Sequence, residues 1–182
     1  MKKCLYLTLA LLASALLLAS CMSDDTDTSS TDLQKGDPLP TFAVSLSIGD
    51  TGDWRWQEAP WQVTSASLRG KRSVIVFFNT GCPDCQEELP VVQELYDAVK
   101  GDANIELVCI SREEGEESIR AYWQANGLTL PYSPQEDAAV FRLFASHTIP
   151  RIYIANATAT ITATFADNPK ATLGQLKAAL GI

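Results

Sequence analysis

The sequence predicts an α/β protein in which helices cover a mixed central sheet, and two observations carry that prediction. Residues 73–78 form a continuous apolar run that leads directly into a helical repeat of apolar residues. Such a run is typical of a strand that is covered on both faces. Residues 151–155 and 159–165 are β-rich runs separated by three residues, which predicts an antiparallel hairpin. The central run instead belongs to a parallel β-α-β unit, so the sheet is expected to contain strands of both directions.

The elements before the central strand have their own local signals. Apolar residues alternate over residues 41–48, which is typical of a strand with one buried face. Residues 50–60 carry Gly, Asp and Pro around Trp54 and Trp56, so they are expected to form a loop or hairpin. A turn at residues 70–72 then leads into the central strand.

The elements after the central strand continue the alternation. Leu89, Val92, Leu95 and Val99 recur at spacings of three or four residues, so an amphipathic helix is expected from about Pro83. The remaining elements are a strand at 105–110, a helix at 116–126 that Gly127 ends, and helices at 138–145 and 173–180. Right-handed crossovers are expected to place helices on both faces of the sheet, which gives a three-layer α/β/α sandwich.

The first twenty residues are predicted to be a signal peptide and no part of the fold. Lys2 and Lys3 precede an apolar stretch over residues 5–19, which is shorter than the roughly 20 residues that a membrane-spanning helix needs. The sequence Leu-Ala-Ser-Cys at 18–21 resembles the bacterial lipobox, whose Cys receives a diacylglyceryl group and becomes the mature N-terminus. Cys21 is therefore the predicted lipidation site, and the alternative is an ordinary signal peptide. The resemblance places the protein outside the cytoplasm of a Gram-negative bacterium.

The segment after Cys21 is predicted to be a polar tether over residues 21–35, followed by one domain over 36–182. Ser, Thr and Asp dominate the tether, and a chain of this composition cannot build a core. Its acidic residues also resemble a surface-export signal of Bacteroidetes lipoproteins, so the periplasmic face and the outer-membrane surface both stay open. Without the signal peptide, 12 basic residues face 22 acidic ones and the net charge moves from −8 to −10. This balance argues against a nucleic-acid partner and makes the lipid the expected membrane anchor.

The chemistry is predicted to lie in Cys82 and Cys85, a CxxC pair between the central strand and the helix after it. At a helix N-terminus, unpaired backbone N–H groups and the helix dipole favour a negative charge, which lowers the pKa of a thiol there. Cys82 is therefore the expected nucleophile. Cys85 lies one turn along the helix and can attack the mixed disulfide that Cys82 forms.

Three other interpretations compete with a redox pair. A structural disulfide would close a very short loop and add little stability. A zinc site needs four ligands, and the rest of the domain offers Cys109 and His147. Two inert buried thiols would leave the position at a helix start unexplained. Cys109 lies in an apolar run and is expected to be a core residue, and we expect no metal and no cofactor beyond a Cys82–Cys85 disulfide.

Several segments together resemble the thioredoxin superfamily and its TlpA/ResA-like extracytoplasmic branch. Glu88 and Pro90 follow the CxxC pair in the pattern CxxCxxExP. The sequence Thr-Ile-Pro at 148–150 resembles the proline loop of that family, and the opening at 36–42 resembles the branch as well. The resemblance covers residues 36–182. It implies a thioredoxin-like sandwich that exchanges disulfides with protein substrates and receives electrons from a membrane thiol protein.

The resemblance also implies roles for individual residues. Pro150 would follow a cis peptide bond beside the CxxC pair, and the backbone of Ile149 would pair with a substrate strand. Glu88 would face Cys85 and accept the proton of the resolving thiol, because a half-buried carboxyl has a raised pKa.

Two positions depart from the family pattern. Gly81 and Asp84 stand where the family usually has Trp and Pro. The negative charge of Asp84 is expected to raise the pKa of the Cys82 thiol, and stabilising a thiol over a thiolate favours a reducing protein. We therefore predict a reductase of protein disulfides.

Two other functions are compared with this prediction. A copper chaperone of the SCO type has a similar fold and could use the same cysteines, but it pairs a CxxxC with a distant His, whereas the spacing here is CxxC. A peroxiredoxin would show Pro and Thr seven and three residues before its Cys. Ile75 and Asn79 occupy those positions relative to Cys82, which argues against a peroxidase.

Overall fold

The computed structural model of the protein describes residues 32–47 and 62–182. The expected signal peptide, Cys21, most of the expected tether, Trp54 and Trp56 lie outside the described residues. Within the described part of the chain, no helix combines the length and the apolar character needed to cross a bilayer.

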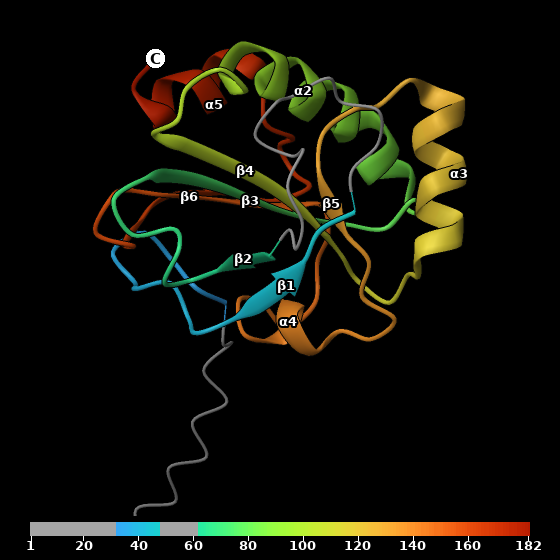
Figure 1. Ribbon diagram of the computed structural model, residues 1–182, viewed down its shortest axis with the longest axis horizontal. Helices are drawn as coiled ribbons and strands as arrows, with labels where there is room; N and C mark the ends of the chain where they lie inside the picture. Colours follow the sequence, from blue (N-terminus) through green and yellow to red (C-terminus); the bar gives the residue numbers. More distant parts are fainter. Residues whose placement is uncertain (1–31, 48–61) are drawn as a thin grey trace, which may run out of the picture.

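A five-stranded mixed sheet forms the centre of the molecule (Figure 1). In spatial order its strands are β5 (Tyr132–Ser133), β4 (Ile105–Ser111), β3 (Arg72–Phe78), β6 (Arg151–Ala155) and β7 (Ile161–Phe165). β3, β4 and β5 are parallel, whereas β6 runs antiparallel to β3 and β7 runs antiparallel to β6. The predicted parallel unit, the hairpin and the mixed sheet are therefore confirmed.

The two faces of the sheet are covered differently. One face carries the helices α2 (Pro83–Val99), α3 (Glu116–Asn126) and α5 (Leu173–Leu180). The other face carries β1 (Ala43–Ser45), its antiparallel partner β2 (Gln62–Thr64) and the short helix α4 (Ala139–Arg142). Figure 1 shows α2 and α5 above the sheet and β1, β2 and α4 below it. Because β3, β4 and β5 succeed one another in one direction across the sheet, right-handed crossovers put α2 and α3 on the same face.

The continuous apolar run of β3 is explained by its two buried faces. Val74, Val76 and Phe78 belong to the core beneath the three helices, and Ile75 and Phe77 belong to the core on the opposite face. All five side chains are at most 1% exposed. The end of β3 is therefore a rigid base for the loop that carries the first cysteine.

Local signals explain where the helices begin and end. Pro83 is the first residue of α2, where its missing N–H costs no hydrogen bond. Gly127 ends α3 with φ 64°, a left-handed conformation that glycine adopts without strain. Thr172 and Gln175 form a capping box at the start of α5, so this helix covers the predicted residues 173–180.

Several elements differ from the predictions: β1 is shorter than the strand expected at 41–48, and β2 was not predicted. The helix expected at 138–145 ends at Arg142, because Leu143 and Phe144 form tighter bonds to carbonyls three residues back. The two-residue strand β5 was not predicted, since a segment this short shows no periodicity. β7 begins at residue 161, because the Asn156 side chain holds residues 158–160 in a turn.

The domain begins earlier than predicted. Residues 32–35 were expected to belong to the tether, but the Leu33 N–H donates to the Phe144 carbonyl at 2.8 Å and the Leu33 side chain packs against the core. Asp32 contacts Ser146 and Arg151 as well. The described N-terminal segment is therefore part of the domain from Asp32 onward.

Candidate active site

Cys82 is the N-cap residue of α2, as the sequence predicts. Its N–H donates to the Asn79 carbonyl at 3.0 Å, and its carbonyl accepts the N–H of Gln86 at 3.0 Å. The side chain is partly exposed and makes no capping hydrogen bond, so the thiol is free to meet a partner. It lies at the N-terminal end of a 17-residue helix, where unpaired backbone N–H groups give the helix a partial positive charge.

The loop before Cys82 is held by bonds between the segment after β3 and the segment after β4. The Asn79 amide donates to the Arg112 carbonyl at 3.0 Å, and its oxygen accepts the Gly81 N–H at 2.8 Å. Both the N–H and the hydroxyl of Thr80 donate to the Glu114 carboxylate. Sequence reasoning did not identify Glu114, which lies 34 residues from Thr80. These bonds fix the backbone that presents the nucleophile.

Cys85 is completely buried on the inner face of α2. Burial raises the pKa of its thiol far above the ordinary value. The Asn79 backbone opposes this rise, and the neighbouring Cys82 and Asp84 add to it. The two cysteines therefore differ as the sequence predicts, with one reachable thiol and one protected thiol that loses its proton with difficulty.

The proline loop, residues 147–150, lies against the nucleophile. The Ile149–Pro150 peptide bond is cis, as the resemblance implied. The Cys82 Sγ atom lies 3.8 Å from the Ile149 carbonyl oxygen. The guanidinium of Arg112 donates to the His147 carbonyl and so connects this loop to the end of β4. Segments about 67 residues apart in sequence thus meet at the thiol.

Glu88 is the buried carboxyl group of α2, with 3% of its surface exposed. It accepts a hydrogen bond from the Ala171 N–H at 3.1 Å. Burial raises its pKa, while the Ala171 bond and the charge of Lys170 partly oppose the rise. A carboxyl group of this kind keeps its proton to a higher pH than an exposed one.

The charge of Asp84 has a counterion that the sequence did not reveal. Lys170, in the segment before α5, lies 3.0 Å from the Asp84 carboxylate and also contacts Glu87. These contacts raise the pKa of Lys170, so it stays charged. The positive charge of Lys170 therefore partly neutralises the negative charge that Asp84 places beside the cysteine pair.

A pocket of 310 Å³ lies between α2 and α3. It is lined by Gln86, Pro90, Gln93, Glu94, Tyr122, Asn126, Gly127 and Leu128. Burial raises the pKa of Tyr122, and the charge of Cys85 contributes to that rise.

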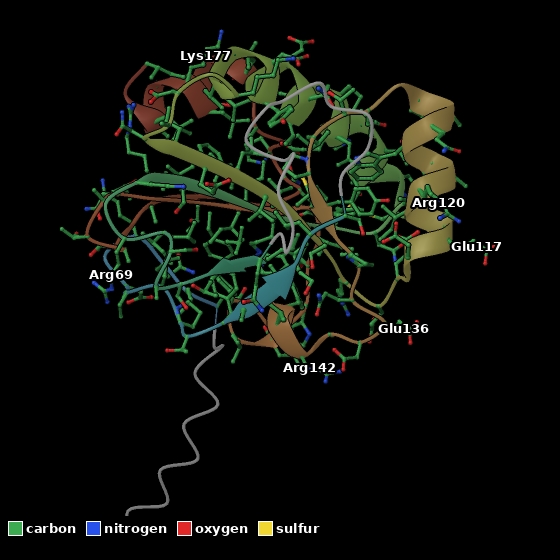
Figure 2. All side chains as sticks on the ribbon, viewed as in Figure 1. Arg69, Glu117, Arg120, Glu136, Arg142 and Lys177 are labelled. Carbon is green, nitrogen blue, oxygen red and sulfur yellow. The ribbon has the colours of Figure 1, made fainter. Side chains whose placement is uncertain are left out.

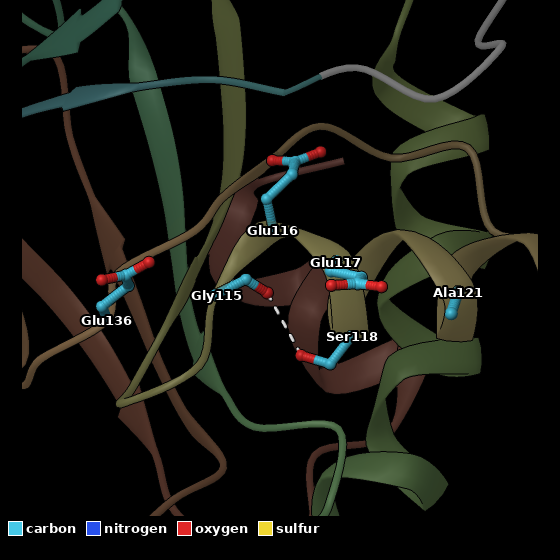
Figure 3. Close-up of a pocket in the computed structure, with 6 residues that line it drawn as sticks. All are labelled: Gly115, Glu116, Glu117, Ser118, Ala121 and Glu136. Carbon is cyan, nitrogen blue, oxygen red and sulfur yellow. Dashed lines mark hydrogen bonds between the residues drawn. The ribbon is translucent and has the colours of Figure 1, made fainter.

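Other charged regions lie away from the cysteines. Figure 2 shows that Arg69, Glu117, Arg120 and Lys177 project outward from the fold. A second pocket at the start of α3 is lined by Glu116, Glu117 and Glu136, with a Ser118 to Gly115 hydrogen bond at its base (Figure 3). Over residues 32–47 and 62–182, no group of three or more His, Cys, Asp or Glu side chains lies close enough to hold a metal ion.

The predicted site residues that the structure describes lie on α2 or beside its start. The cysteine pair, Ile149 and Pro150 meet at the start of α2, and Glu88 lies on the buried face of the same helix. Cys109 is a fully buried core residue, as expected. His147 is exposed at the outer end of the proline loop, and Cys21 lies outside the described residues.

The comparisons with known proteins agree with this geometry. The model of the AhpC/TSA family matches residues 36–164. Sporulation thiol-disulfide oxidoreductase A of Bacillus subtilis is 28% identical over 91 residues, which are 48% of this chain and 54% of the relative. The thiol-disulfide oxidoreductase ResA of Halalkalibacterium halodurans is 25% identical over 89 residues, 49% of this chain and 50% of the relative. The chain therefore spans about half the length of these curated relatives.

A solved structure extends the likeness to most of the fold. The crystal structure of StoA from Bacillus subtilis superposes with a TM-score of 0.59 at 21% identity, and the match covers 78% of this chain and 98% of StoA. At this identity the match establishes the thioredoxin-like fold.

Proposed function

The chain belongs to the AhpC/TSA family, and we propose that it is a thiol–disulfide oxidoreductase that reduces protein disulfides outside the cytoplasm. The observation that carries this proposal is the placement of Cys82. Its partly exposed thiol caps α2, lies 3.8 Å from the carbonyl of the proline loop, and has the buried Cys85 one turn behind it. The curated relatives named as thiol-disulfide oxidoreductases support the same reaction.

The first step is an attack by the Cys82 thiolate on one sulfur of a client disulfide. The client S–S bond breaks, Cys82 becomes bonded to the attacked sulfur, and the other client sulfur leaves as a thiolate. The Ile149 backbone is the expected partner for an extended client strand, beside the cis Pro150. Backbone pairing of this kind accepts many side-chain sequences and suits a protein with several clients.

The second step releases the client. Cys85 gives its proton to Glu88, and its thiolate attacks the Cys82 sulfur. The Cys82–Cys85 disulfide forms and the second client thiolate leaves, so two electrons pass from the dithiol to the client and both client sulfurs end as thiols after protonation. No other cofactor is required, because the Cys82–Cys85 disulfide is itself the redox centre. A membrane thiol protein would return the two electrons.

The signal sequence supports the proposed location. Cys21 would carry a lipid that holds the mature chain at a membrane, facing the periplasm or the surface of the outer membrane. Changing Cys21 to Ser should release the protein into the soluble fraction. If the variant stays with the membranes, the lipid anchor is wrong.

The proposed reaction is tested on the mature chain carrying Cys21→Ser. We expect the dithiol to reduce protein disulfides, with a reduction potential below about −220 mV, in the range of reducing rather than oxidising members of the fold. Cys82→Ser should lose the activity, and Cys85→Ala should accumulate a mixed disulfide that captures the client on Cys82. A potential near that of a strong oxidant would contradict the reducing direction.

The same preparation distinguishes the two competing functions. Tight Cu(I) binding without disulfide exchange would favour the SCO-type chaperone that uses the same cysteines. Peroxide reduction is not expected, because Ile75 is buried in β3 and the Asn79 amide is already bonded to the Arg112 carbonyl. Rapid consumption of hydrogen peroxide by the dithiol would therefore contradict the proposal.

A further inference from the structure

One carboxylate joins the two ends of the proline loop. The Asp32 Oδ1 atom accepts hydrogen bonds from the N–H and the hydroxyl of Ser146, each at 2.7 Å. The Asp32 Oδ2 atom lies 2.9 Å from the Arg151 guanidinium. Ser146 immediately precedes residues 147–150, and Arg151 immediately follows them. We call this set of contacts the Asp32 bridge.

The Asp32 bridge is largely shielded from water. The side chain of Asp32 is 18% exposed and that of Arg151 is 10% exposed. Charge-assisted hydrogen bonds are stronger than neutral ones, and a shielded site keeps them strong because water competes less. Burial alone would raise the pKa of Asp32, but the two Ser146 hydrogen bonds and the charge of Arg151 outweigh it, so the pKa lies below its ordinary value.

The acid is itself held in place from the other side. The N–H of Leu33 donates to the Phe144 carbonyl at 2.8 Å, and the Leu33 side chain packs against the core beside α4. The backbone next to Asp32 is therefore fixed, and its carboxylate can act as a rigid brace. Within the loop, the Arg151 Nε atom also approaches the Thr148 carbonyl at 3.5 Å.

We propose that Asp32 is a positioning residue for substrate strands, because the Asp32 bridge fixes the loop whose Ile149 backbone faces Cys82. The proposal rests on the proposed function and specifies how its substrate contact is maintained. A peptide disulfide must pair with the loop as well as reach Cys82, whereas a small disulfide needs the thiol alone. Loosening the loop should therefore weaken peptide binding and leave the chemistry at the thiol unchanged.

The test uses the mature chain with Cys21→Ser and compares two substrates. One is an extended peptide joined through a disulfide to thionitrobenzoate, and the other is 5,5′-dithiobis(2-nitrobenzoate) itself. For Asp32→Asn we expect KM for the peptide to rise about tenfold with little change in kcat, because pairing is lost from both ground and transition states. The rate with the small disulfide and the reduction potential should stay within twofold of the parent.

Matched variants separate positioning from general damage. Asp37→Asn removes the same charge from the same segment, where the carboxylate accepts the Gln34 N–H, and should behave as the parent. Ser146→Ala removes one of the three contacts and should give a smaller rise in the peptide KM. Equal losses with both substrates would show that Asp32 is merely structural and would overturn the proposal.

Amide hydrogen exchange tests the brace without any activity. In Asp32→Asn the amides of residues 146–149 should exchange at least tenfold faster, while those of β3 and β4 should keep the parent rates. If the parent chain reduces neither disulfide, the proposed function fails, and the exchange data still decide whether Asp32 fixes the loop. Unchanged exchange in the loop would contradict the positioning role.

Discussion

Two shielded carboxyl groups lie in the regions that support the dithiol, and their environments shift them in opposite directions. Asp32, at the proline loop, accepts three contacts that include an Arg guanidinium, and its pKa is lowered despite burial. Glu88, on α2, has 3% exposure and one backbone hydrogen bond, and its pKa is raised because burial outweighs that bond and the charge of Lys170. Asp32 therefore keeps its charge to a lower pH than an ordinary carboxyl group, and Glu88 keeps its proton to a higher pH, as its proposed role in proton transfer requires.

The difference follows from the number and charge of the partners. A carboxylate that is fully paired gains nothing from a proton and serves as a brace. A carboxyl group that is buried with a single neutral donor keeps its proton to higher pH and can exchange it with a neighbouring thiol. This comparison explains why Glu88 suits acid–base chemistry and Asp32 suits structure.

The largest expected effect on the rate of client release comes from replacing Glu88, the proposed proton acceptor. Glu88→Gln keeps an oxygen for the Ala171 N–H but cannot accept a proton, so we expect resolution of the mixed disulfide to slow about 100-fold. Rapid-quench measurement of client release follows that step directly. Glu87→Gln, a neighbouring change at an exposed site, should release the client at nearly the parent rate. A Glu88→Gln variant within threefold of the parent would show that Glu88 has no part in the step.

The next effect comes from removing the brace. Asp32→Ala leaves Arg151 and Ser146 without their partner in a site of low exposure, so we expect the free energy of unfolding to fall by about 2–3 kcal/mol. Urea titration of the mature chain measures this loss. Asp37→Ala should cost much less, because its carboxylate accepts a bond in an exposed turn. Equal losses in the two variants would remove the distinction between the two acids.

The sequence indicated Glu88 as the candidate proton acceptor but gave no sign of the role proposed for Asp32. Glu88 lies in a motif with Cys82 and Cys85, and its helical spacing places it on the buried face of α2. Asp32 lies in a run of Ser, Thr and Asp whose composition is typical of a tether, and the family model begins at residue 36. Its partners are 114 and 119 residues away, and local patterns carry no information about such contacts.

The elements of the fold also divide into those with a local sequence signal and those without one. The strands of the β-α-β unit and helix α5 were predictable, because each has a full period of apolar residues or a capping signal. The two-residue β5 was not, because tertiary pairing forms it without local periodicity, and α4 was predicted in place but is shorter than expected. Lys170 and Glu114 were missed for the same reason, since each reaches the site from a distant polar segment.

The pH dependence of stability should distinguish the two acids by sign. The pKa of Asp32 is lowered in the folded protein. Its contribution to the free energy of unfolding is therefore present above about pH 3.8 and is lost as the pH falls below that value. The pKa of Glu88 is raised, so its favourable contribution is present below 4.5 and is lost as the pH rises through the folded value. Asp32→Asn should therefore flatten the decline in stability below pH 4. Glu88→Gln should gain stability relative to the parent above pH 4.5, and a loss there would contradict the raised pKa.

The smallest effect is expected from Lys170, which acts on Glu88 from a partly exposed position. Its charge opposes the rise in the pKa of Glu88, so Lys170→Met should move the midpoint of the pH profile of client release upward by about 0.3 pH unit. Because the lysine is partly exposed and its partner Asp84 is half exposed, 0.5 M salt should remove most of this difference, whereas it should leave the effect of Asp32→Asn on peptide KM almost unchanged. Lys177→Met, a loss of the same charge on α5, is the control and should leave the midpoint in place. If salt suppressed the effects of Lys170→Met and Asp32→Asn equally, the Asp32 bridge would be no better shielded from solvent than the contacts of Lys170.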